Sequence, residues 1–296
     1  MIKQIWFWLQ NSRIFSLPMA ILSWSVIFVY SLKFGGNILN GFLALIGISF
    51  GQLATNLFDD YMDYKNLNDN SQKCKCAYIK ENKATLNDVL MVVITYCIIA
   101  SLTGFILFIR AGWPVIWLAL IGGAIVLTYS KLSQIGFSEI AVGITFGPLL
   151  FEGVYYVMTK HFSIEVLFLS LAVVMFTIGL MYVHTVLDFE SDMCSHKKTL
   201  ACRLNDKTKA VNSVWVVYGL GYFFTLIFSI LTKNYLCLIT LVLLPLIFKM
   251  YSSLNSYTSG GDVKEFYFRL LQARNLMIYY SLIIIACIIF KITIFP

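Results

Sequence analysis

Long apolar runs separated by short polar clusters make up most of the chain. The length of each run is close to that of a helix that crosses the hydrocarbon core of a bilayer, which is about 20 residues. The runs are continuously apolar and lack the two-residue alternation of a membrane β-barrel. The pattern therefore predicts an all-α polytopic membrane protein, with a single transmembrane domain over residues 1–296. The nine expected helices are 14–33, 38–58, 86–109, 113–130, 137–158, 163–188, 212–232, 235–251 and 275–294.

The composition excludes a water-soluble globular domain. Hydrophobic residues make up 59% of the chain and charged residues only 12%, whereas roughly a quarter of the residues of a soluble domain are charged. The seven cysteines are an odd number, and Cys97, Cys237 and Cys287 lie in apolar runs, where thiols behave as small buried hydrophobes. No disulfide framework is expected.

The basic residues indicate how the chain crosses the membrane. If the N-terminus is cytoplasmic, all but five of the 22 basic residues fall on the cytoplasmic side, as the positive-inside rule requires. The net charge of +7 is then a topology signal, and we expect no nucleic-acid partner. The expected location is the plasma (inner) membrane, with the N-terminus in the cytoplasm. The five basic residues on the other side are Lys33, Arg110, Lys160, Lys233 and Lys291.

Two clusters of aspartates lie at helix ends on the predicted cytoplasmic side. The members are Asp59, Asp60 and Asp63, followed by Asp69, in the first cluster, and Asp188 and Asp192 in the second. In each cluster two aspartates four residues apart share a helical face, where like charges repel and the C-terminal end of the helix dipole disfavours anions. A bound divalent cation compensates such an arrangement. Mg²⁺ is the natural choice, because it commonly binds one or two carboxylates together with substrate phosphates.

The two clusters have the same internal spacing. Asp188 and Asp192 follow Asp59 and Asp63 by 129 residues, which corresponds to four helices with their loops and indicates an internal four-helix repeat. Flanking lysines can supply point charges to phosphate oxygens. The inferred ligand is a diphosphate held between the clusters, and the alternatives are solvated helix ends or carboxylates paired with neighbouring lysines. The lysines are Lys65, Lys73, Lys80, Lys131, Lys197 and Lys198.

The residues around both clusters resemble the two aspartate-rich motifs of the UbiA superfamily of intramembrane prenyltransferases. Residues 59–65, DDYMDYK, with the later Asp69, are similar to the first motif, which is usually Asn-Asp-x-x-Asp. Residues 188–192, DFESD, with the tail KKTLA at 197–201, are similar to the second motif. The order of the motifs, the number of helices and the spacing agree with the superfamily over nearly the whole chain.

Within the superfamily, the chain looks most like the 1,4-dihydroxy-2-naphthoate polyprenyltransferase branch. Three positions depart from the usual pattern, because Asp59 and His184 stand where Asn is common and Leu187 where Arg is frequent. The stretches that carry the similarity to this branch are 13–18, 129–131, 136–139 and 146–157.

The resemblance implies an enzyme that transfers a polyprenyl group from a polyprenyl diphosphate to an aromatic acceptor, 1,4-dihydroxy-2-naphthoate, in menaquinone biosynthesis. It implies action within the lipid bilayer, with Mg²⁺ as the cofactor and no obligate protein partner. The implied catalytic residues are Asp60, Asp63, Asp188 and Asp192, and Asp59 and Asp69 join them as metal ligands. The implied substrate-binding residues are Arg13, Asn56, Lys65, Tyr129, Lys131, His184, Lys197 and Lys198.

Other functions remain open from the same residues. A superfamily member that acts on 4-hydroxybenzoate, on a haem or porphyrin group or on a glycerol phosphate lipid would carry the same two clusters. A secondary transporter can also contain internal repeats with paired acidic sites. A catalytically silent scaffold descended from such an enzyme is a third possibility.

Several single residues also have more than one interpretation. Glu152 lies inside an expected span and is functional, close to the outer surface or paired with a tyrosine. His184 is a hydrogen-bond partner, a general base or an interior histidine. A further set offers zinc-ligand types without a usual zinc spacing, and it consists of Cys74, Cys76, Cys194, His196 and Cys202.

Overall fold

The structure, a computed structural model, describes residues 2–66, 76–194, 198–257 and 263–294. Every regular element within these residues is a helix, and no strand occurs among them. The all-α fold predicted from the apolar runs is confirmed. Asp69, Lys73, Cys74, His196 and Lys197 lie outside the described residues.

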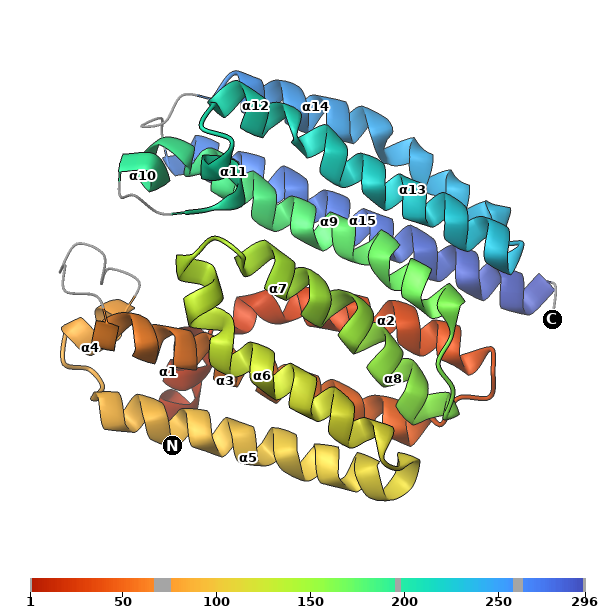
Figure 1. Cartoon of the computed structure of the whole chain (residues 1–296), viewed down its shortest axis with the longest axis horizontal. Helices are drawn as coiled ribbons and strands as arrows, with labels where there is room; N and C mark the ends of the chain where they lie inside the picture. The colour runs from red at the N-terminus through yellow and green to blue at the C-terminus, as the bar shows by residue number, and fades with distance from the viewer. Residues whose placement is uncertain (1, 67–75, 195–197, 258–262, 295–296) are drawn as a thin grey trace.

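The first half of the chain forms four long helices and short connecting ones (Figure 1). Pro18 stands in the first turn of its helix, where its missing N–H costs no hydrogen bond. Thr85 and Asp88 form a capping box that starts another helix. The elements are α1 (Ile2–Asn11), η1 (Ile14–Ser16), α2 (Leu17–Leu32), α3 (Ile38–Asn66), α4 (Ala77–Lys80), α5 (Leu86–Ala111) and α6 (Pro114–Gln134).

The second half is built in the same way, with one more long helix at its end. The Ser163 hydroxyl accepts the N–H of Glu165 and so caps the start of the central helix α9. The elements are α7 (Ser138–Ile144), η3 (Thr145–Leu149), α8 (Leu150–Thr159), α9 (Ile164–Leu187), α10 (Phe189–Cys194), α11 (Leu200–Arg203), α12 (Lys207–Asn212), α13 (Val214–Thr232), η4 (Tyr235–Leu243), α14 (Leu244–Asn255) and α15 (Val263–Ile294).

The packing of the helices follows the expected repeat. The long helix α3, which carries the first acidic cluster, packs along α5, and its counterpart α9 packs along α13. The last helix, α15, lies against both α9 and α2 and so joins the two halves (Figure 1). Each acidic cluster therefore ends a helix that is held at the centre of its own half.

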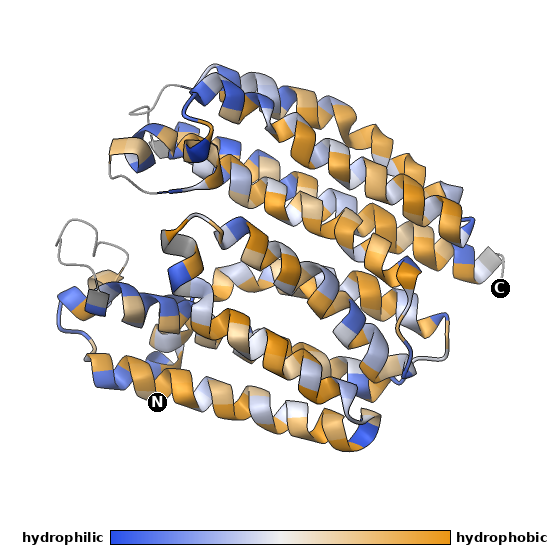
Figure 2. Ribbon diagram, in the orientation of Figure 1, coloured by the Kyte–Doolittle hydropathy of each residue, from blue (hydrophilic) through white to orange (hydrophobic). Residues whose placement is uncertain are grey.

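Eight helices in the described part of the chain are long and apolar enough to cross a membrane. The ninth expected span, 113–130, forms α6, whose apolar part Pro114–Tyr129 is shorter than the others. Figure 2 shows hydrophobic residues along the length of the bundle and hydrophilic residues gathered at the helix ends. The chain is an integral, multi-pass membrane protein.

Three helices differ from the sequence-based expectation. The second expected span, 38–58, continues to Asn66 as α3. The fifth expected span is divided into α7, η3 and α8, because Gly147 has a non-helical backbone and Pro148 lacks the N–H that a continuous ladder needs. The last span begins at Val263 rather than near residue 275. Its charged first turns are held in place because Arg269 pairs with Glu265 and donates to the Ser253 carbonyl of α14.

Candidate active site

The two acidic clusters lie at the same end of the bundle. The first cluster ends α3, which is followed by α4, and the second ends α9, which is followed by α10 and α11. Figure 1 shows α4, α10 and α11 at one end of the molecule and the C-terminus at the other. Carboxylates that are 129 residues apart in the chain are thus presented to the same side of the bundle.

Asp60 is the most buried member of the first cluster, with 2% of its surface exposed. One carboxylate oxygen accepts a hydrogen bond from the guanidinium of Arg13, and the other accepts one from the Tyr78 hydroxyl at 3.3 Å. The Cys76 thiol donates to the Asp60 carbonyl at 3.4 Å. Asp60 therefore anchors both the N-terminal segment and α4 to the end of α3.

The other two aspartates of this cluster are more accessible. Asp59 lies 3.8 Å from Arg13, with 14% of its side chain exposed, and Asp63 is partly exposed one helical turn later. The expected pair on one face of the helix is therefore present. Both side chains are partly exposed at this end of the bundle.

Arg13 reaches the cluster through an unusual backbone conformation. Its φ of 59° and ψ of 50° are left-handed, which a side chain rarely adopts without compensation. Burial lowers the pKa of the Arg13 guanidinium, but the carboxylates of Asp60 and Asp59 outweigh this effect and hold that pKa above its ordinary value. The amide of Asn56 donates to the Ser12 carbonyl at 2.9 Å and so ties the same turn to α3.

Replacing Arg13 tests this anchor. Arg13→Ala leaves the carboxylate of Asp60 buried with only Tyr78 as a partner. We expect the free energy of unfolding to fall by about 2 kcal/mol, less than for a fully buried pair because part of Arg13 is exposed. Thermal unfolding of the purified protein in detergent measures the change. Arg13→Lys keeps the charge but not the planar fork, and is expected to recover part of the loss. Wild-type stability in Arg13→Ala would contradict the anchoring role.

The second cluster spans the junction between α9 and α10. The helix ends at Leu187, but the N–H of Asp192 still donates to the Asp188 carbonyl at 2.8 Å, so one helical turn continues across the junction. The Asp188 carboxylate lies 3.2 Å from Nδ1 of His184 and is one-third exposed. Asp192 is buried, with 6% of its surface exposed. Nearly half of the His184 side chain is exposed, so it is not an interior histidine, and its ring nitrogen contacts Asp188.

The segment after the second cluster packs on the turn between α6 and α7. Gly136 has a φ of +78°, and a Cβ atom there would lie 1.7 Å from the Lys198 carbonyl oxygen. Arg203 donates to the Ile135 carbonyl at 2.6 Å, and its guanidinium lies 4.3 Å from the ring centroid of Phe137. Only a glycine permits this approach of the two backbones. The contact brings the tail of the second motif next to the turn that follows Lys131.

The remaining expected substrate-binding residues surround this end of the bundle. Tyr129 is half-buried near the end of α6 and interacts electrostatically with Asp59, Arg13 and Glu139. Lys131 and Lys198 are exposed. Lys65 is also exposed, and its ammonium lies 5.9 Å from the ring centroid of Tyr61.

Three residues that reasoning from the sequence did not assign to the site also lie at it. Tyr78 and Cys76 contact Asp60 from the connection after α3, where no spacing rule points to them. Glu139 is fully buried and accepts a hydrogen bond from the Ser138 hydroxyl at 2.9 Å. Its electrostatic neighbours are Tyr129 and Tyr182. The sequence offered one sign of Glu139, namely that it is an acidic residue in an apolar segment. Such a residue needs a polar partner when it is buried, and only the fold identifies that partner.

Glu152 belongs to a different part of the molecule. It lies on α8 and accepts the N–H of Ser163 at 3.4 Å, next to the start of α9. Because the second cluster lies at the other end of α9, Glu152 is remote from both clusters.

The described residues give no support to a zinc site. No three potential ligands among His, Cys, Asp and Glu come together in this part of the chain. Burial and the nearby carboxylates raise the pKa of the Cys76 thiol to about 12, which disfavours its thiolate form.

The protonation state of Cys76 leads to a labelling prediction. At pH 7 we expect Cys76 to react with iodoacetamide far more slowly than the exposed Cys194, because Cys76 is both buried and protonated. Mass spectrometry of the alkylated, digested protein measures both sites in one sample. Equal labelling rates would contradict the buried position of Cys76.

The carboxylates of the two clusters are the ligand type that a metal ion shared with a phosphate requires. Each oxygen of Asp60 accepts a hydrogen bond from a protein donor, and the other carboxylates are Asp59 and Asp63 in the first cluster and Asp188 and Asp192 in the second. Proteins usually bind Mg²⁺ through one or two carboxylates, and the phosphate oxygens of the substrate complete the coordination of the ion.

Comparison with known proteins identifies the fold and the family. No curated protein matches the chain. A structure of digeranylgeranylglyceryl phosphate synthase superposes with a TM-score of 0.68 at 15% identity, covering 97% of this chain and 99% of that one. The apo UbiA homologue of Aeropyrum pernix K1 superposes with a TM-score of 0.66 at 15% identity, covering 93% of this chain and 98% of that one. The UbiA homologue of Archaeoglobus fulgidus bound to GPP and Mg²⁺ superposes with a TM-score of 0.61 at 13% identity, covering 94% of this chain and 99% of that one. Since residues 16–276 match the UbiA prenyltransferase family, this chain belongs to that family and is a prenyltransferase.

Proposed function

We propose that this prenyltransferase moves a polyprenyl group from a polyprenyl diphosphate to an aromatic acceptor, 1,4-dihydroxy-2-naphthoate, in menaquinone biosynthesis, and that residues 1–296 form one transmembrane domain. The observation that carries the proposal is the position of two aspartate clusters and several basic residues at the same end of an apolar bundle. A metal cation bound between the carboxylates neutralises the aspartates, and the phosphate oxygens of a diphosphate neutralise the basic residues.

The proposed metal ligands are Asp59, Asp60 and Asp63 on α3 and Asp188 and Asp192 after α9, with Asp69 outside the described residues. Bound Mg²⁺ neutralises the negative charge that develops on the departing diphosphate. Solved structures of an Archaeoglobus fulgidus UbiA homologue with Mg²⁺ and GPP or DMAPP support this choice of metal and donor. Asp60 accepts a hydrogen bond from Arg13 at one carboxylate oxygen and from Tyr78 at the other, and we propose that it holds both side chains in place as well.

The chain's own basic and aromatic groups bind and orient the donor. Lys131 and Lys198 come from segments that meet at Gly136, so both can reach the same diphosphate. Arg13 and Tyr129 lie beside the first cluster and can donate to further phosphate oxygens. Lys65 and Lys197 complete the proposed set, and Asn56 supports it by tying the Arg13 turn to α3.

After the diphosphate leaves, an allylic cation must be kept from water until the acceptor attacks it. The apolar helices around the site exclude water, and the prenyl tail can lie along them toward lipid (Figure 2). On the second cluster, His184 holds the Asp188 carboxylate through its ring nitrogen, 3.2 Å away. We therefore propose that His184 positions Asp188 for the metal.

We further propose that both clusters and the N-terminus face the cytoplasm across the plasma (inner) membrane. The support is the distribution of basic residues, since only five of the 22 fall at the opposite end under this orientation. Transport is the weaker alternative, because both clusters lie at helix ends, whereas transporter sites are usually near the membrane midplane.

The test uses the purified protein in lipid with Mg²⁺, a radiolabelled polyprenyl diphosphate and a panel of acceptors. A labelled naphthoquinone precursor formed from 1,4-dihydroxy-2-naphthoate, and lost with EDTA, is the expected result. Product from 4-hydroxybenzoate or a glycerol phosphate lipid instead would replace the acceptor but keep the prenyl transfer. Absence of transfer to every acceptor, in protein that still binds the donor, would contradict the proposal.

A further inference from the structure

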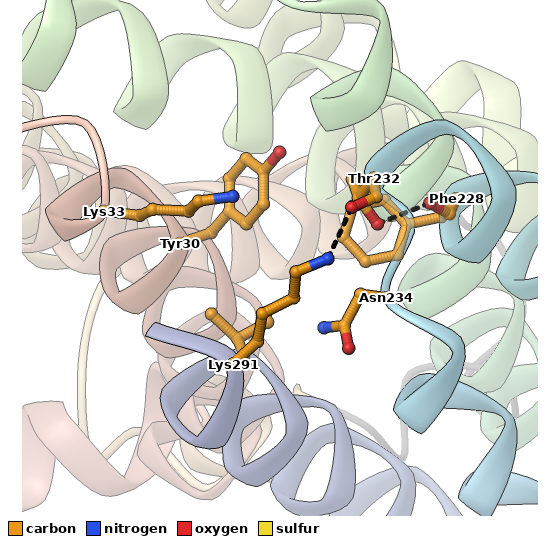
Figure 3. Close-up of a pocket in the computed structure, with 7 residues that line it drawn as sticks. Tyr30, Lys33, Phe228, Thr232, Asn234 and Lys291 are labelled. Atoms are coloured by element: carbon orange, nitrogen blue, oxygen red, sulfur yellow. Dashed lines mark hydrogen bonds between the residues drawn. The ribbon is translucent and has the colours of Figure 1, made fainter. Parts of the chain in front are cut away.

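A small pocket lies at the end of the bundle opposite the aspartate clusters, where α2, α13 and α15 end near one another. Figure 3 shows two lysines entering it from different helices, Lys33 from the end of α2 and Lys291 from the last turn of α15. We call it the Lys33–Lys291 pocket. Its other lining residues are Tyr30, Phe228, Thr232, Asn234 and Ile288.

Of the two ammonium groups, only that of Lys291 donates hydrogen bonds to other residues among those that the structure describes. The Lys291 Nζ donates to the carbonyls of Thr232 and Lys233, at 2.7 Å each, and so closes the C-terminal end of α13. An ammonium has three donors, which leaves one N–H directed elsewhere. Lys33 has no such role, and its Nζ lies 5.4 Å from the ring centroid of Phe34.

The charges around the pocket favour an anion. Lys33 and Lys233 both lie within electrostatic range of Lys291 and repel its ammonium, and the carboxylate of Glu165 attracts it. In the part of the chain that the structure describes, neither Lys33 nor Lys291 forms an ion pair with a carboxylate. The nearby carboxylate of Glu165 accepts a hydrogen bond from Tyr30.

The surroundings of the pocket identify the kind of anion. Large apolar side chains flank it, and Phe34, Tyr235 and Phe290 are each 45% to 60% exposed. Since the pocket lies where membrane-spanning helices end, these side chains face the boundary between acyl chains and headgroups. An anion with an attached apolar tail can contact both the lysines and the exposed apolar side chains, whereas a free anion can contact only the lysines.

We propose that the Lys33–Lys291 pocket binds the phosphate of an anionic phospholipid in the leaflet opposite the aspartate clusters. The phosphate accepts hydrogen bonds from both ammonium groups, and the acyl chains lie along the exposed apolar side chains of α2 and α15. This site is separate from the proposed donor site and does not depend on which acceptor the enzyme uses.

The test compares lipid binding to the purified full-length protein by native mass spectrometry, with phosphatidylglycerol and phosphatidylcholine as probes. Phosphatidylglycerol is expected to bind more tightly, and Lys33→Gln to weaken it by about fivefold, since a lysine near an anionic lipid contributes about 1 kcal/mol. Lys160→Gln is the matched control, because Lys160 is exposed at the same end and does not line the pocket. The control is expected to bind both lipids as the wild type does.

Three outcomes would overturn the proposal. The first is unchanged phosphatidylglycerol affinity in Lys33→Gln, and the second is an equal loss in Lys160→Gln, which would indicate a general surface-charge effect. The third is displacement of the lipid by millimolar inorganic phosphate, which would assign the pocket to a free ion. Lys33→Gln leaves the Lys291 cap intact, so its unfolding temperature should match the wild type and keep the comparison valid.

Discussion

Asp63→Asn and Asp192→Asn are each expected to abolish measurable prenyl transfer while the protein still folds in detergent or lipid. Each change removes one negative charge from a proposed metal-binding pair without altering the volume of the side chain. Losing one group that stabilises developing charge typically costs about 10²–10³ in turnover. The measurement is the rate of labelled product formation at saturating donor and Mg²⁺.

The matched control for both variants is Glu81→Gln. Glu81 lies on the same side of the molecule just after α4, is exposed, and pairs with Lys83 at 2.5 Å. The substitution Glu81→Gln removes the same amount of charge as either aspartate variant, and it is expected to leave the rate of prenyl transfer unchanged. Full activity in both aspartate variants would reject the proposed site, whereas a loss in Glu81→Gln as well would point to a general electrostatic effect.

Gly136→Ala is expected to impair both folding and activity. The left-handed backbone alone costs an alanine about 1–2 kcal/mol. In addition, the new Cβ atom would lie 1.7 Å from the Lys198 carbonyl oxygen, so the segment after the second cluster must move. Displacing a substrate-positioning group by about 1 Å can lower the rate by about 10²-fold. Thermal unfolding and the transfer assay measure the two effects separately.

Gly35→Ala is the control that separates backbone strain from displacement. Gly35 also has a positive φ, +68°, but nothing lies within 4 Å of where its Cβ would be. It is therefore expected to lose stability of the same order from backbone strain and to keep its turnover. If Gly136→Ala behaved in the same way as Gly35→Ala, the contact with Lys198 would have no part in the site.

Much of this architecture was predictable because the bilayer imposes simple rules on sequence. Apolar runs of the right length must be helices, since unpaired backbone groups are too costly in lipid. The all-α bundle and the repeat of α3 and α9 followed from this rule and from the spacing of the aspartates, but eight helices in the described part of the chain, rather than nine, are long and apolar enough to span. The break at Gly147 and Pro148 was missed, because an apolar run with one proline still has the composition of a span.

The candidate site was predictable in its charged members only. Repeated aspartates at helix ends break local electrostatic rules, so Asp59, Asp63, Asp188 and Asp192 stood out without a structure. Asp60 stood out with them, and the sequence contained no sign that its oxygens are used by Arg13 and Tyr78. Hydrogen-bond partners far apart in the chain carry no spacing signature.

The sequence by itself determined the class of molecule, because hydrophobic length, charge asymmetry and the two aspartate motifs are local properties of the chain. Only the tertiary structure decided which groups meet. It placed Lys198 on the Gly136 turn, left Asp60 buried as an anchor, and brought Lys33 and Lys291 together from helices near opposite ends of the chain. These outcomes depend on how helices pack in three dimensions, and packing couples residues whose separation in sequence carries no record of their contact.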